Sequence, residues 1–238
     1  AVSLTLHNLG TIYQLKGQFD DAIKLYEVSI SLKKKLGQSG DIPETLVAIG
    51  IIFRSKGEYD KALEYFERAL EVSNSLHNRG DAANALQNIG GVFYLWGEYD
   101  KALEYYQNAL DIFKEQENSI EVAKVNGDIG LIYKTRKNFN KALENYEKSL
   151  AIFRKQGQIN EVLIVLSNIA EIRIFNGQAE MAEQTLAEIL VISKELRLEE
   201  KRAGALANLA IILRMRGQFK KALLNYHEAL EIYKNLGL

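Results

Sequence analysis

Residues 89–109 read IGGVFYLWGEYDKALEYYQNA, and this stretch decides the fold. On either side of Gly97, small and apolar residues follow one another at intervals of three and four, which is the period of one face of an α-helix. Gly97 stands where a helix can end in a left-handed residue without a side-chain clash. The stretch therefore predicts two helices joined by a tight turn at Gly97.

The same pattern recurs six times at intervals of 40 residues, without insertion or deletion. In each unit a small residue, an alanine and an aromatic residue keep their places. The small residues are Gly10, Gly50, Gly90, Gly130, Ala170 and Ala210; the alanines are Ala22, Ala62, Ala102, Ala142, Ala182 and Ala222; the aromatic residues are Tyr26, Phe66, Tyr106, Tyr146 and Tyr226, with Leu186 in the fifth unit. One hairpin cannot bury its own apolar faces, so the units are predicted to stack into a continuous core.

Each unit is expected to be a pair of antiparallel helices, helix A followed by helix B. Asp41 and Asp81 are predicted to cap the A helices that follow them. The turns between helix A and helix B are expected at Gly17, Gly57, Gly97, Lys137, Gly177 and Gly217. The predicted fold is all-α, a single solenoid domain over residues 1–238, with repeats at about 3–42, 43–82, 83–122, 123–162, 163–202 and 203–238.

This pattern resembles the tetratricopeptide repeat, a resemblance carried by Ile89, Gly90, Phe93, Gly97, Ala102, Tyr106 and Ala109. The usual period is about 34 residues; the longer one here is similar to the subclass of kinesin light chains, LGN/Pins adaptors and bacterial Rap-type regulators. The resemblance implies a right-handed superhelix with the A helices along a concave face that binds peptides. The chain opens inside an A helix and ends without a capping helix. We therefore expect a segment of a longer array, with uncapped ends that self-associate.

By this resemblance, five positions of each A helix face the groove: six and three residues before the small residue, and one, four and five after it. In units two to six these positions hold Glu44, Val47, Ile51, Arg54 and Ser55; Asn84, Gln87, Gly91, Tyr94 and Leu95; Lys124, Gly127, Leu131, Lys134 and Thr135; Ile164, Ser167, Glu171, Ile174 and Phe175; and Gly204, Ala207, Ile211, Arg214 and Met215. The mixture of basic and apolar side chains favours a segment with acidic residues beside apolar anchors. Alternatively, each apolar side chain packs against the neighbouring A helix.

A polar series lies two residues before the small residue, with asparagine in four units and Asp128 in a fifth. Carboxamides both donate and accept hydrogen bonds, so this ladder would suit an extended peptide backbone. By resemblance, such asparagines edge the groove; the equally weighted alternative is that each bonds the neighbouring hairpin and sets its stacking angle. The predicted binding residues are Asn8, Arg54, Asn88, Tyr94, Lys124, Asp128, Lys134, Asn168, Glu171, Asn208 and Arg214.

Composition argues against several other classes of function. The net charge is -1, without the basic excess that nucleic-acid binding favours. Cysteine is absent, and His7, His77 and His227 lie in separate units, with the last two expected on B helices, so no metal site is predicted. No nucleophile or phosphate-binding motif occurs, which predicts neither an enzyme nor a cofactor. No apolar run approaches the roughly 18 residues of a membrane span, and no signal peptide is visible, so we expect a cytoplasmic protein without a membrane partner.

The predicted function is a scaffold or adaptor that holds a protein or peptide segment in the groove of the A helices. A ligand-responsive sensor domain of a larger signalling or transcription protein is the main alternative, and a structural self-assembly module is a third. An appended DNA-binding or kinase segment in the full-length gene would favour the sensor.

The fifth unit departs most from the pattern. Arg173 replaces the Tyr or Phe of the earlier units, Ala179 and Leu186 replace aromatic residues, and Ile189 replaces a small residue. The charge of Arg173 is expected to reach water or a carboxylate, such as Glu171 or Glu180, because an unpaired buried charge is costly. Drift in a tolerant repeat and a functional weak joint both predict faster local opening of this unit.

Overall fold

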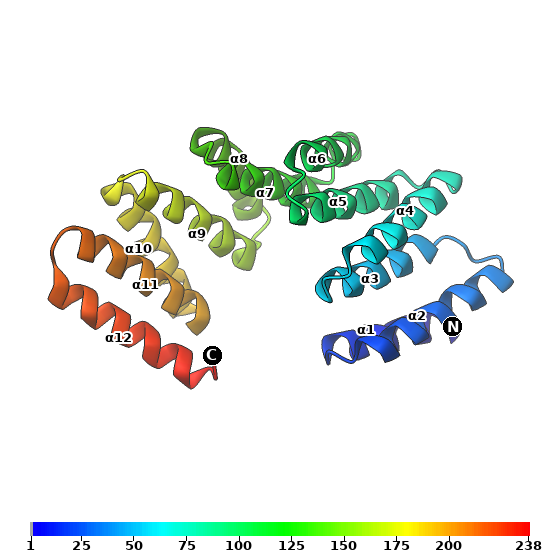
Figure 1. The fold of residues 1–238 in the computed structure, drawn as a ribbon, viewed down its shortest axis with the longest axis horizontal. Helices are drawn as coiled ribbons and strands as arrows, with labels where there is room; N and C mark the ends of the chain where they lie inside the picture. Colours follow the sequence, from blue (N-terminus) through cyan, green and yellow to red (C-terminus); the bar gives the residue numbers. More distant parts are fainter. Residues whose placement is uncertain (1) are drawn as a thin grey trace. The chain divides into compact units, whose positions relative to one another are not determined.

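The computed structural model describes residues 2–238, which form twelve α-helices arranged as six consecutive hairpins (Figure 1). The A helices are α1 (Val2–Leu15), α3 (Ile42–Ser55), α5 (Arg79–Leu95), α7 (Ser119–Thr135), α9 (Ile159–Phe175) and α11 (Glu199–Met215). The B helices are α2 (Phe19–Lys35), α4 (Tyr59–Ser75), α6 (Tyr99–Glu115), α8 (Phe139–Lys155), α10 (Ala179–Glu195) and α12 (Phe219–Asn235). These residues contain no strand, so the predicted all-α solenoid of helical hairpins is confirmed.

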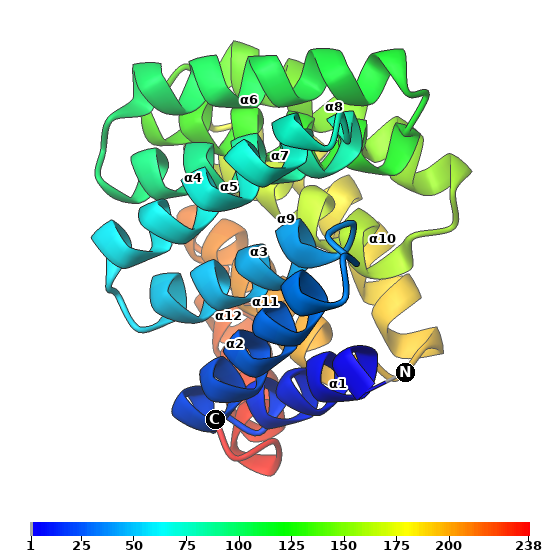
Figure 2. The ribbon, with the colours of Figure 1, turned by 90° about the vertical axis from the view of Figure 1, so that its right-hand side faces the viewer.

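The chain divides into two compact units, each made of several of the 40-residue repeats. The first unit ends at Asp128 and the second begins at Ile129, so the boundary falls inside α7. In the first unit α3 contacts α2, α4 and α5, which can be followed in Figures 1 and 2. In the second unit α9 contacts α8, α10 and α11. Neighbouring A helices therefore lie against one another in both units. A single domain over the whole chain stays a prediction.

The turns between helices A and B lie where the sequence predicts them. Gly57 has a φ of 76°, its N–H donates to the Arg54 carbonyl over 3.0 Å, and the next N–H, that of Glu58, donates to Phe53 over 2.9 Å. Lys137, which breaks the glycine series, takes the same left-handed conformation with a φ of 58°. The hydrogen bonds that end the helix therefore impose this conformation even on a residue with a β-carbon.

Two predictions near the helix ends are wrong, those for Asp81 and His77. Asp81 lies in the first turn of α5 and does not cap it; the cap is Asn78, whose Oδ1 accepts the Asp81 N–H over 3.1 Å. Asp41 is the N-cap residue of α3, as predicted, although its side chain makes no capping hydrogen bond. His77 lies in the turn after α4 with a φ of 54°, and not on a B helix. From the third unit on, the A helices begin four residues before the predicted repeat boundaries.

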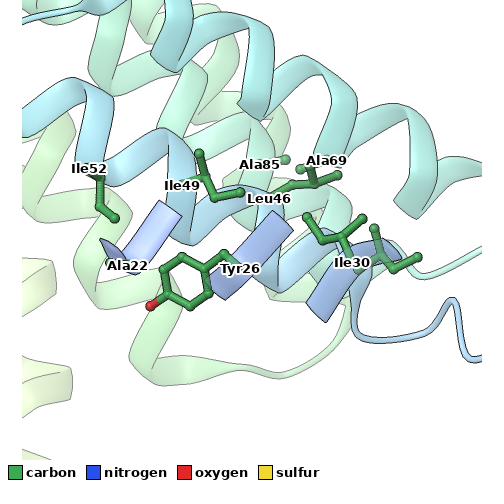
Figure 3. Close-up of a cluster of buried hydrophobic side chains, with 9 residues drawn as sticks. Ala22, Tyr26, Ile30, Leu46, Ile49, Ile52, Ala69 and Ala85 are labelled. Atoms are coloured by element: carbon green, nitrogen blue, oxygen red, sulfur yellow. The ribbon is translucent and has the colours of Figure 1, made fainter. Parts of the chain in front are cut away.

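The core of the first unit joins consecutive hairpins. Figure 3 shows Tyr26 of α2 beside Ile49 and Ile52 of α3, in a buried cluster that also includes Ala69 of α4 and Ala85 of α5. Tyr26 is 1% exposed, and these four partners are fully buried. Because this cluster draws on three hairpins, no hairpin of the first unit could bury its apolar face alone.

Each early repeat pairs a glycine of helix A with an aromatic ring of helix B. A β-carbon on Gly90 would lie 2.8 Å from Cδ1 of Tyr106, and one on Gly130 would lie 2.9 Å from Cδ1 of Tyr146. Real β-carbons do not approach other atoms so closely, so the glycine leaves the space that the aromatic ring occupies. In the fifth repeat the smaller Leu186 takes the place of the ring, and Ala170 takes the place of the glycine.

The fifth repeat compensates for its lost aromatic residues. In the second repeat Phe53 stacks on Tyr65 with 5.4 Å between ring centroids. At the equivalent positions the guanidinium of Arg173 donates to Thr185 Oγ1 over 2.5 Å and to the Met181 carbonyl over 3.3 Å. Among the described residues, Arg173 is therefore held by neutral oxygens and not by Glu171 or Glu180, the carboxylates suggested beside water as its partners. Its Nε is buried without a hydrogen-bond partner. Ile189, which replaces a small residue of the other repeats, is buried at 1% exposure.

Candidate functional site

The predicted groove positions differ in their exposure along each A helix. The position five residues after the small residue is open, with Leu95, Phe175 and Met215 exposed at 45%, 68% and 61%. At the positions one and four residues after it, the apolar side chains of Tyr94, Leu131, Ile174 and Ile211 are half-buried. Apolar side chains therefore both pack on neighbouring helices and reach the surface, according to their place in the repeat.

A pocket of about 430 Å³ opens on the A helices of the first unit. Its walls come from α3, α5, α6 and the first half of α7: Pro43, Glu44, Val47, Arg54, Asp81, Asn84, Gln87, Asn88, Gly91, Tyr106, Glu121, Lys124 and Asp128. Four of the predicted binding residues, Arg54, Asn88, Lys124 and Asp128, meet here. Tyr94 on α5 lies outside the lining; it is half-buried, with its ring 5.8 Å from that of Tyr99.

Two asparagines of the series bond to the preceding A helix. Arg54 Nη1 on α3 donates to Asn88 Oδ1 on α5 over 3.1 Å, and the Asn88 amide donates to the Asn84 carbonyl. In the second unit Lys134 Nζ on α7 donates in the same way to Asn168 Oδ1 on α9 over 2.6 Å. These are the contacts expected if the asparagines set the stacking of neighbouring hairpins; contact with a ligand stays a prediction.

The basic residues of the groove are partly neutralised within the chain. Lys134 also lies 2.9 Å from Glu171, and Lys124 lies 2.7 Å from Glu121. Arg214, on α11, is exposed. The remaining predicted residues, Asn8 of α1 and Asn208 of α11, are exposed and half-buried respectively, and lie outside the pocket.

Asp128 and Tyr106 are the most perturbed groups of the pocket. Burial raises the pKa of Asp128 to about 6, against a hydrogen bond from Gln87 Nε2 over 2.8 Å and the charge of Arg54, which lower it. Burial also raises the pKa of Tyr106, and the nearby Asp128 carboxylate adds to the rise. Sequence reasoning named Asp128 but assigned no site role to Tyr106. The missing signal was the neighbouring Gly91, which replaces a larger residue.

A smaller pocket of about 240 Å³ lies on the second unit. Its lining combines Lys134, Lys137 and Glu171 with the rings of Phe139 and Phe175. The two rings are tilted against one another with 5.0 Å between centroids. This pocket presents an apolar surface with charged groups at its margin.

Residues 2–238 offer neither a cluster of metal ligands nor a membrane-spanning helix. No group of three or more histidine, aspartate or glutamate residues in this part of the chain could hold a metal ion. None of its helices is both long enough and apolar enough to cross a membrane.

The tandem hairpins and the open face of the A helices define a helical-repeat protein of the kind that binds other proteins. Models of the tetratricopeptide repeat match residues 5–38, 41–115, 81–155 and 161–235, and the chain belongs to this family. No curated protein matches the sequence.

Solved structures with the same fold include BtubC (BKLC) from P. vanneervenii, 20% identical, with a TM-score of 0.81 and 92% of each chain covered. A putative kinesin light chain of Podospora anserina is 16% identical, with a TM-score of 0.68 over 82% of this chain and 95% of that one. A Rap protein complexed with competence and sporulation factor is 18% identical, with a TM-score of 0.69 over 99% of this chain and 64% of that one. At these identities the likeness extends to the fold alone.

Proposed function

We propose that this protein is a scaffold that binds a peptide or protein segment on the exposed face of its A helices, without catalysis of its own. The tetratricopeptide family is generally used for protein interaction, and a Rap protein of the same fold carries a bound factor. Segments of this kind are held by side-chain pockets and by hydrogen bonds to their backbone. We place the protein in the cytoplasm as part of the same proposal.

The observation that carries this proposal is the pocket of the second unit. Phe175 is 68% exposed on a groove position and lies against Phe139. A large exposed ring in a hollow often marks an interface, because its burial against a partner removes apolar area from water. Lys137 at the margin and Arg214 on α11 supply positive charge in this unit. An apolar anchor flanked by acidic residues therefore fits this surface.

Selection of a random peptide library on the whole chain tests the proposal. We expect enriched peptides to carry aromatic or aliphatic anchors beside Asp or Glu. Phe175→Ala should weaken their binding about tenfold or more, as measured by fluorescence anisotropy, because an anchor of this size is typical of an interface hot spot. Arg214→Glu should weaken binding and reduce its dependence on salt.

Leu224→Ala is the matched control. Leu224 is 69% exposed, as Phe175 is, but it lies on the B helix α12, away from the groove positions. Its loss should leave peptide affinity unchanged. A library without any enriched sequence would contradict the proposed function, and equal losses in the two alanine variants would contradict the proposed surface.

A further inference from the structure

Tyr26 and Tyr106 occupy the same place in two repeats of the first unit but have different hydrogen-bonding partners. The Tyr26 hydroxyl donates to Gln14 Oε1 over 2.9 Å and lies 3.1 Å from Thr11 Oγ1. Tyr106 is 5% exposed and lines the pocket, yet its hydroxyl has no hydrogen-bond partner among residues 2–238. Because this hydroxyl opens on the pocket, it can bond to a group that enters there.

Gly91 explains this difference. In the first repeat the residue after the small glycine is Thr11, which reaches the tyrosine hydroxyl. In the third repeat the same position is Gly91, and a β-carbon there would lie 3.7 Å from the Tyr106 hydroxyl and 3.1 Å from Arg54 Nη1. The absent side chain leaves the hydroxyl facing the pocket.

Charges in the pocket are unbalanced. Four carboxylates line it, those of Glu44, Asp81, Glu121 and Asp128, against the two cations Arg54 and Lys124. Lys124 is paired with Glu121, and Arg54 donates to the neutral Asn88. Asp128 Oδ2 accepts from the neutral amide of Gln87. The interior of the pocket therefore holds a carboxylate and a hydroxyl that a single additional cation would satisfy.

We propose that this pocket binds one cationic side chain, a lysine or arginine of the bound segment, between the Asp128 carboxylate and the Tyr106 hydroxyl. The inference rests on the proposed peptide-binding function and specifies a residue that its ligand carries. A pocket of about 430 Å³ has room for a side chain as well as for water. The alternative occupant is an acidic side chain of the ligand bound to Arg54. Such an anionic group would meet more carboxylates than cations in this pocket, which disfavours it.

The cation should bind best when Asp128 is ionised. Burial raises the pKa of this carboxyl to about 6, and a cation beside it would lower that pKa again. Binding of a cationic ligand therefore releases protons near pH 6, and its affinity should fall as the pH is lowered from 7.5 to 5.

N-acetyl-arginine amide is a direct probe of the pocket, used with the full chain and followed by NMR. We expect it to shift the Asp128 carboxyl carbon and the Gln87 side-chain amide, and to lower the pKa of Asp128. N-acetyl-glutamate amide should do neither. Gly91→Leu should abolish the effect by filling the pocket. Leucine already occupies the equivalent position in the fourth repeat as Leu131, and circular dichroism would verify the fold of the variant.

Asp128→Asn removes the charge and keeps an oxygen for Gln87. Peptides selected on the wild-type chain should be enriched in Lys or Arg, and cationic ones should bind this variant at least about tenfold more weakly. Enriched peptides without a basic residue, or peptides that bind Asp128→Asn as well as wild type, would overturn the inference and leave the proposed function intact. A library without enriched peptides would contradict the proposed function. The arginine amide tests the cation pocket separately, and absence of any response to it would overturn the pocket whatever the library shows.

Discussion

Gly50 offers the most direct test of how these hairpins pack. A β-carbon at this position would lie 2.7 Å from Cδ1 of Phe66 and closer still to Cε1. Phe66 is fully buried, so its ring has little room to move away. Gly50→Ala should therefore destabilise the protein, although alanine is the better helix former and Gly50 lies inside α3.

The magnitude follows from two opposing terms. Replacing an interior glycine of a helix with alanine contributes about 0.5–1 kcal/mol of stability, whereas overpacking a core typically costs about 1–3 kcal/mol. We expect a net loss of about 1–2 kcal/mol. If Phe66 is first replaced with leucine, as in the Ala170 and Leu186 pair of the fifth repeat, the clash disappears. Gly50→Ala should then be neutral or stabilising by up to about 1 kcal/mol.

A double-mutant cycle measures this coupling. The wild-type chain, Gly50→Ala, Phe66→Leu and the double variant would be unfolded in urea and followed by circular dichroism, with amide exchange in α3 and α4 as a local readout. We expect a coupling energy of about 2 kcal/mol between the two sites. Equal effects of Gly50→Ala in the wild-type chain and in the Phe66→Leu variant would refute the steric reasoning, because they would show that the ring does not limit the size of the residue opposite.

Three further predictions concern other parts of the chain. Burial raises the pKa of Asp128 to about 6 in the folded state, whereas its pKa is about 4 in the unfolded chain. Ionisation of Asp128 therefore destabilises the fold above pH 6 and not below pH 4. In urea unfolding, Asp128→Asn should raise the free energy of unfolding by up to about 2–3 kcal/mol at pH 7.5 and by little at pH 4. Amides of residues 164–192 should exchange faster than those of residues 84–112, because Arg173 carries an unsatisfied buried nitrogen; equal protection would contradict this. Leu223 and Tyr226 on α12 are exposed, and Leu223→Glu should reduce concentration-dependent association in sedimentation, whereas an already monomeric parent would show that this face does not self-associate.

The sequence by itself determined the helices, their pairing and the turns between them. These features depend on contacts within one repeat, where spacings of three and four residues select a helix face and a left-handed residue ends the helix. Lys137 shows how strong this local determination is, since it adopts the conformation of the glycines it replaces. The Asn78 cap was missed, although Asn followed three residues later by Asp81 resembles a capping pattern that could have revealed it.

Only the tertiary structure decided how the groove is charged. Arg54 on α3 meets Asn88 on α5, 34 residues later, and Gln87 on α5 meets Asp128 on α7, 41 residues later. Periodicity identifies the face on which such residues lie, but not which nitrogen meets which oxygen, because that depends on side-chain rotamers and on the separation of the helices. The sequence therefore predicted a basic groove, whereas the packed pocket of the first unit exposes an excess of carboxylates. The role of Gly91 also depends on the fold. The space left by its missing side chain matters only because Tyr106 and Arg54 lie next to it.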